Sequence, residues 1–200
     1  ADARFVLSGG REDVITLALP DIGKLQDGQS EYNLYLAFWL KHGTGLTMID
    51  IFGNRLVCRN STRRAFSRGF AFGIRHTGNA DERFKLAGKT YQRLNDHMAQ
   101  VRETMAKLES TTCNVPSTID ALLGIDADSS TKLKNRRDSL VSRASDSRNS
   151  VGPNLMTVYN AVTNMVTFPD SEKARTDSSW NGALASFEDA AFDKLLEMAS

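Results

Sequence analysis

An arginine-rich segment is the part of the chain whose residue types most clearly suggest chemistry. Residues 51–80, which we call the basic block, contain six arginines and no aspartate, glutamate or lysine. The chain of 200 residues has a net charge of only +1, so the remainder must sum to −5. A surface that serves only solubility mixes charges of both signs. The segregation of charge therefore indicates a binding role.

Arginine and aromatic side chains alternate within the basic block, and single-stranded nucleic acids are bound by this combination. Guanidinium groups make planar, bidentate contacts with phosphate, and aromatic rings stack on bases. The block therefore predicts a nucleic-acid-binding site that favours single-stranded DNA. The predicted site residues are Arg55, Arg59, Arg63, Arg64, Arg68, Phe70, Arg75 and His76. Two alternatives stay open, because the arginines could instead pair with acids elsewhere in the chain or bind an acidic protein partner.

Catalytic and cofactor motifs do not accompany this block. The sequence has no G-x-S-x-G elbow, no P-loop and no H-E-x-x-H motif. Its histidines and its two cysteines, Cys58 and Cys113, do not show the spacing of zinc ligands. We therefore expect a binding protein rather than an enzyme, with no catalytic residues, no metal and no cofactor. We also expect Cys58, which ends an apolar segment, to be a buried and unreactive thiol.

Two other functional classes remain as alternatives. A Mg²⁺-dependent nuclease or nucleotide hydrolase would use acids at the ends of strands, although the spacing of these acids does not demand a metal site. The candidate acids are Asp13, Asp21, Glu31 and Asp50. A protein that modulates host machinery, such as a polymerase or a defence complex, would use the basic block to bind another protein.

The basic block follows segments with the character of β-strands. Apolar residues alternate or run continuously through 13–20, 32–40, 46–52 and 54–58. We expect a mainly antiparallel sheet of about four or five strands, with turns at 41–45 and at Phe52–Asn54. Residues 61–72 are expected to form a short helix with Asn60 or Ser61 as its N-cap.

A long helix is predicted after the basic block, because apolar residues recur there with alternating spacings of three and four. Such a pattern produces an apolar seam along one side of a helix. The seam residues are Phe84, Ala87, Tyr91, Leu94, Met98, Val101, Met105 and Leu108. We expect this helix to pack across the sheet or within a bundle, and the alternative is that its seam joins two subunits of a homo-oligomer.

The rest of the chain is expected to be helical. Helices are predicted at 113–125, at 154–168 and near the C-terminus, whereas the Ser-rich, charged residues 126–152 form either a polar exposed helix or a mobile linker. Strands followed by helices indicate the α+β class. We predict a single domain over residues 1–200, in which 1–78 is the strand-rich part and 79–200 is the helical part.

The apolar runs are far shorter than the ~20 residues that span a bilayer, and we expect no signal peptide. We expect no membrane association and a cytoplasmic location in a bacterial host cell.

Three short motifs resemble a family carried by phages and plasmids, known as domain of unknown function 932. They are the R-V-V-C-x-N-like segment Arg55–Asn60, the R-H-T segment Arg75–Thr77, and the N-A-V-T segment Asn160–Thr163. The resemblance extends from about Tyr32 onward and implies a phage, prophage or plasmid setting without supplying an activity. Genes of such elements often serve replication, recombination or annealing of DNA. The family usually carries S-H-D-G after the central strand, whereas this chain has KHGTG, which keeps His42 and loses the acid.

Overall fold

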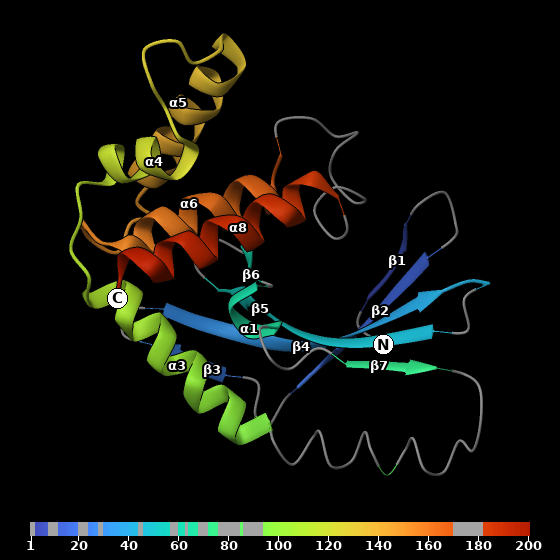
Figure 1. Ribbon diagram of the computed structural model, residues 1–200. Coiled ribbons are helices and arrows are strands. Elements are labelled where there is room, and N and C mark those ends of the chain that lie inside the picture. The colour runs from blue at the N-terminus through green and yellow to red at the C-terminus, as the bar shows by residue number, and fades with distance from the viewer. Residues whose placement is uncertain are drawn as a thin grey trace.

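The N-terminal part of the chain forms one antiparallel sheet (Figure 1). The computed structural model describes residues 3–7, 12–19, 24–27, 30–43, 46–56, 60–62, 64–67, 72–75, 85, 94–169 and 182–200. Within these residues the strands are β1 (Ala3–Leu7), β2 (Glu12–Ala18), β3 (Lys24–Asp27), β4 (Ser30–Lys41), β5 (Leu46–Arg55), β6 (Ser61–Thr62) and β7 (Phe72–Arg75). Their order is β1-β2-β4-β5-β6, with β3 also paired to β4 and β7 also paired to β5. The predicted α+β class is confirmed.

The central strand β4 has apolar side chains on both faces. Tyr32 and Leu34 belong to the core cluster that includes the helices, whereas Ala37 and Trp39 belong to a second cluster on the other face. Successive side chains of a strand point to opposite faces, which explains the division. Burial of both faces accounts for the nearly continuous apolar run of this strand.

The predicted turn at Phe52–Asn54 is wrong, because β5 continues through these residues. Gly53 is held in the sheet from both sides, by pairing with Leu34 of β4 and with Thr62 of β6. The tripeptide has turn-forming residues, but two neighbouring strands fix its backbone in the extended conformation. The predicted turn at 41–45 is confirmed at its described residues, where Gly43 has a φ of 81°.

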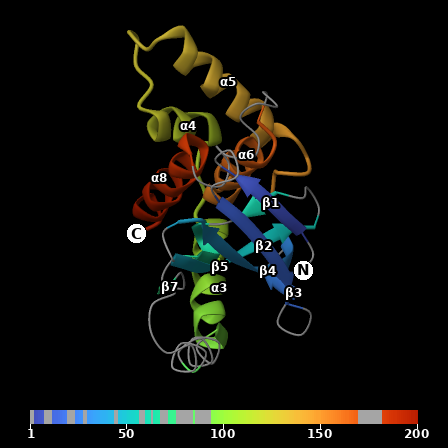
Figure 2. The same ribbon diagram turned by 90° about the vertical axis from the view of Figure 1, so that its right-hand side faces the viewer.

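Six described helices follow or interrupt the sheet. They are α1 (Arg64–Ser67), α3 (Leu94–Ser110), α4 (Val115–Leu123), α5 (Thr131–Ser145), α6 (Leu155–Thr167) and α8 (Ala183–Met198). Helices α6 and α8 lie between the sheet and the pair α4 and α5, as both views show (Figures 1 and 2). None of the described helices has the length and apolar character needed to cross a bilayer.

Helix α6 is the central element of the helical part. Eleven of its 13 residues are buried, and the helix packs against α3, α4, α5, α8 and β6. The prediction of a helix at 154–168 is confirmed. Residues 131–145 form α5, so the polar-helix interpretation holds for this part of 126–152.

The apolar seam on α3 faces the interior of the same chain. Leu94, Met98, Val101, Met105 and Leu108 are each at most 3% exposed and belong to the main core cluster. Their burial against the chain's own elements favours the internal-packing interpretation. The other predicted seam residues, Phe84, Ala87 and Tyr91, lie outside the described residues, as does Cys58.

Candidate nucleic-acid interface

The described parts of the basic block follow one edge of the sheet. Strand β6 pairs with Gly53 and Asn54 of β5, and β7 pairs with Leu46–Ile49 near the other end of the same strand. Both lie on the side of β5 away from β4, and α1 contacts β5 between them in the chain. From Leu46 to Asn54 this edge extends for about 25 Å at the usual rise of a strand. The described parts of the block are therefore distributed along a line rather than collected at one point.

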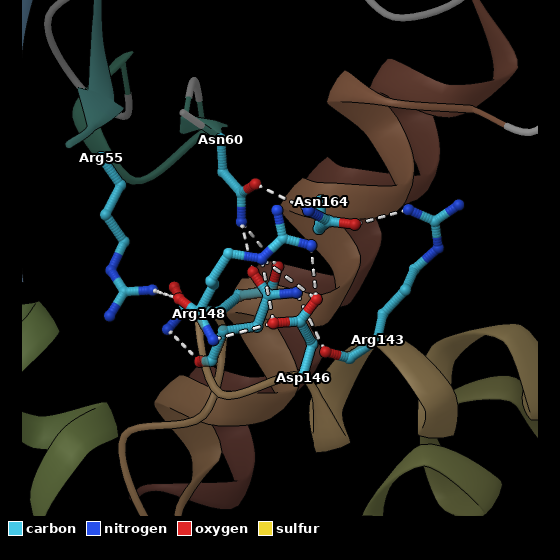
Figure 3. Close-up of polar contacts among 8 residues, drawn as sticks. Arg55, Asn60, Arg143, Asp146, Arg148 and Asn164 are labelled. Carbon is cyan, nitrogen blue, oxygen red and sulfur yellow. Dashed lines mark hydrogen bonds and ion pairs between the residues drawn. The ribbon is translucent and has the colours of Figure 1, made fainter. Parts of the chain in front are cut away.

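Arg55 is an interior residue rather than an exposed phosphate contact. Its side chain is on the helix-facing side of β5, opposite Tyr32, and the residue is only 3% exposed. Its guanidinium Nη1 donates to the carbonyl oxygen of Arg148 at 2.6 Å (Figure 3). Arg55 thus joins the end of β5 to the turn that follows α5.

Arg64 is paired with acids of α8. Its Nη2 lies 2.9 Å from Oδ2 of Asp193, and its Nε lies 3.9 Å from Oδ1 of Asp189. Pairing of the block with acids elsewhere in the chain was one of the interpretations left open by the sequence. For Arg64 the structure shows this pairing.

The remaining predicted site residues have no described side chains. Arg59, Arg63, Arg68, Phe70 and His76 lie outside the described residues. For Arg75 the backbone is described, and it pairs with Leu46 at the far end of β7.

Helix α1 is anchored to the helical part through two buried side chains. Glu188 is 1% exposed, and its Oε1 accepts from the backbone N–H of Arg64 at 3.0 Å. The hydroxyl of Tyr159 accepts from the N–H of Ala65 at 3.3 Å and donates to Glu188 at 3.1 Å. Burial raises the pKa of Tyr159 well above its usual value, so its hydroxyl remains a donor. Helix N-termini carry unsatisfied N–H groups, and these contacts satisfy two of them.

Asn60 does not cap the helix that follows it, contrary to the sequence-based expectation. Helix α1 begins only at Arg64, after the short strand β6. The Asn60 side chain instead points toward α6 and is completely buried (Figure 3). Its Nδ2 donates to Asn149 Oδ1 at 3.1 Å, to Asn160 O at 3.1 Å and to Thr163 Oγ1 at 3.4 Å, and its Oδ1 accepts from Asn164 Nδ2 at 2.9 Å.

Two arginines of the 126–152 segment belong to the same polar cluster. Arg143 donates to Asn164 Oδ1 and to the carbonyl oxygen of Phe168. Arg148 forms an ion pair with Asp146 at 2.7 Å. Hydrogen bonding from Arg148 lowers the pKa of Asp146 to about 2. Arg143 thus links α5 to the end of α6, whereas Arg148 stabilises the turn after α5.

Two of the three motifs singled out in the sequence meet in this cluster. Arg55 and Asn60 come from the first motif, and Asn160 and Thr163 come from the last. The family model described as "Domain of unknown function (DUF932)" matches residues 3–184. The chain belongs to the DUF932 family. No curated protein and no solved structure matches the chain. In this DUF932 chain, the two motifs contribute a buried polar contact between the sheet edge and α6.

Those candidate metal-binding acids of this DUF932 chain that the structure describes do not form one cluster. Asp13 pairs with Leu40 of β4, and Asp50 pairs with Ala37. Leu40 and Ala37 are three residues apart on one strand, so the two carboxylates point to opposite faces. Asp21 and the side chain of Glu31 lie outside the described residues. Within the described part of the chain, no group of three or more His, Cys, Asp or Glu side chains could hold a metal ion.

His42 has a carboxylate partner from a neighbouring strand. Its Nε2 lies 3.2 Å from Oδ2 of Asp13, whose side chain is 7% exposed, whereas the imidazole is 55% exposed. The partner comes from β2, 29 residues earlier in the chain. The sequence places Asp13 and His42 near strand ends but does not predict that the two side chains pair.

Proposed function

We propose that this protein binds single-stranded DNA along the outer edge of β5. We further propose that it acts as an accessory factor in replication, recombination or annealing for a phage or plasmid. The observation that supports DNA binding is the line of β6, α1 and β7 along one sheet edge. These elements belong to a segment with six arginines and no acids. A linear array of cations suits the backbone of an extended strand, and the interleaved aromatic residues suit its bases.

The proposed phosphate contacts are a subset of the arginines predicted from the sequence. Arg55 is buried and Arg64 is paired with acids in the DNA-free protein, so neither is an open contact. The four remaining arginines are Arg59, Arg63, Arg68 and Arg75. Phe70 and His76 are the proposed base contacts.

The chain offers a matched control for a test of this assignment. Lys132 and Lys134 are exposed cations on α5, which lies at the opposite end of the molecule from β7 (Figures 1 and 2). Replacing both with alanine changes the net charge as much as replacing two arginines of the block. It does so far from the proposed DNA-binding edge.

Arg63→Ala combined with Arg68→Ala is expected to weaken binding of a fluorescent oligothymidylate about tenfold or more at low salt. Two charge-assisted phosphate contacts would be lost. The variant with Lys132→Ala and Lys134→Ala should bind within about threefold of the parent, since it loses only long-range attraction. Fluorescence anisotropy measures both affinities. Equal losses in the two variants would contradict the assignment to this edge, and a parent that does not bind would contradict the function.

A further inference from the structure

We propose that α8 competes with DNA for Arg64. In the DNA-free protein the carboxylates of Asp189 and Asp193 form ion pairs with the guanidinium group of Arg64. A DNA phosphate would displace them, so that Arg64 joins the binding edge only when DNA is bound. This inference rests on the proposed function and adds to it an intramolecular contact that limits the affinity.

The pairing of Arg64 is accessible enough to be exchanged. The side chain of Arg64 is 28% exposed, and those of Asp189 and Asp193 are 37% and 41% exposed. Ion pairs in such partly exposed positions contribute little net stability, because water screens them. A phosphate offers guanidinium a bidentate partner, so replacing the carboxylates with phosphate need not disturb the fold.

The space around Asp193 can accommodate its carboxylate after a phosphate has displaced it from Arg64. Asp193 lines an open cavity of about 570 Å³ between α3 and α8, whose lining also includes Lys107, Glu103 and Glu197. A carboxylate released from Arg64 can therefore rotate into water-accessible space, where solvent screens its charge. Displacement does not leave Asp193 as a buried, uncompensated charge.

The backbone of α1 can remain in place during this exchange. The N–H of Arg64 is bound by the buried carboxylate of Glu188, and the N–H of Ala65 is bound by Tyr159. Neither contact involves the guanidinium group. Only side chains need to move, and Arg64 stays beside β5 in both states.

A charge-matched comparison separates this competition from general electrostatics. The test variant carries Asp189→Asn and Asp193→Asn. The control carries Glu103→Gln and Glu197→Gln, which remove two acids from the lining of the same cavity. Both variants gain the same net charge. Binding of oligothymidylate is measured by fluorescence anisotropy over a series of salt concentrations, after circular dichroism has shown that each variant is folded.

The test variant is expected to bind about fivefold more tightly than the parent at low salt. Its salt dependence should match that of the parent, because Arg64 contacts phosphate in both complexes and the number of phosphate contacts is the same. The control should bind within about twofold of the parent with an unchanged slope. Adding Arg64→Ala to the test variant should cancel its gain in affinity and make the slope of log affinity against log salt shallower by about 0.7, since one phosphate contact is lost.

The outcomes distinguish this inference from the proposed function. If neither the parent nor any variant binds oligothymidylate, the proposed function is wrong, and the inferred competition at Arg64 is wrong as well. If all bind but the test variant behaves like the control, DNA binding stands and the competition at Arg64 is overturned. A gain that persists after Arg64→Ala would also overturn it.

Discussion

Asn60→Ala is expected to lower the free energy of unfolding by about 3–5 kcal/mol. The side chain is completely buried and connects β6 to α6 and to the turn after α5. Truncation would leave several polar groups without their Asn60 partner, among them the side-chain amides of the buried Asn149 and the half-buried Asn164. Each unsatisfied buried group costs about 1–3 kcal/mol, and water entering the vacated space would recover part of that cost.

Urea denaturation followed by circular dichroism measures this effect. Asn135→Ala provides the control, because Asn135 is exposed on α5 and the same atoms are removed. We expect the control to change the free energy of unfolding by less than about 0.5 kcal/mol. If Asn60→Ala were as stable as the parent, the polar cluster would not hold the sheet edge against α6.

Met98→Glu is expected to destabilise the protein by more than about 4 kcal/mol and to yield insoluble protein. Met98 is 3% exposed within a single chain and belongs to the core cluster shared by the sheet and the helices. A carboxylate at this position would lose its hydration without gaining a hydrogen-bond donor or an opposite charge as a partner. The penalty is comparable to the whole stability of a domain of ordinary size.

The adjacent residue supplies the control for this substitution. Ala99 is exposed on the same helix, so Ala99→Glu introduces the same group on the solvent side and should leave the protein folded. Analytical ultracentrifugation then compares the soluble species. A folded Met98→Glu monomer obtained from an oligomeric parent would show that the seam joins subunits.

Much of the fold could be predicted because the apolar pattern reports burial directly. The spacing of Met98, Val101 and Met105 identifies the buried side of α3, and the apolar run of α6 matches its central position. The continuation of β5 through Gly53 could not be predicted in the same way. Local turn preference was overridden by pairing with Leu34 and Thr62, and pairing depends on distant parts of the chain.

The partners of the basic block were harder to predict for a related reason. Charge composition identifies arginines that need partners, but it does not say whether the partner is a phosphate or an acid of the same chain. The side chain of Arg55 donates to the carbonyl oxygen of Arg148, which is 93 residues later in the chain. The side chain of Arg64 pairs with Asp193, which is 129 residues later. One sequence signal was available for the polar cluster. Asn160, Thr163 and Asn164 lie on one side of a largely apolar helix, which indicates polar side chains that require partners.

The salt dependence of single-stranded DNA binding by the unmodified protein tests the central claim most directly. Each phosphate contact contributes about 0.7 to the slope of log affinity against log salt. Contacts from Arg59, Arg63, Arg68 and Arg75 therefore predict a slope of about −3, and recruitment of Arg64 adds about −0.7 to it. A binding constant that does not change between low and physiological salt would contradict a phosphate-binding edge on β5.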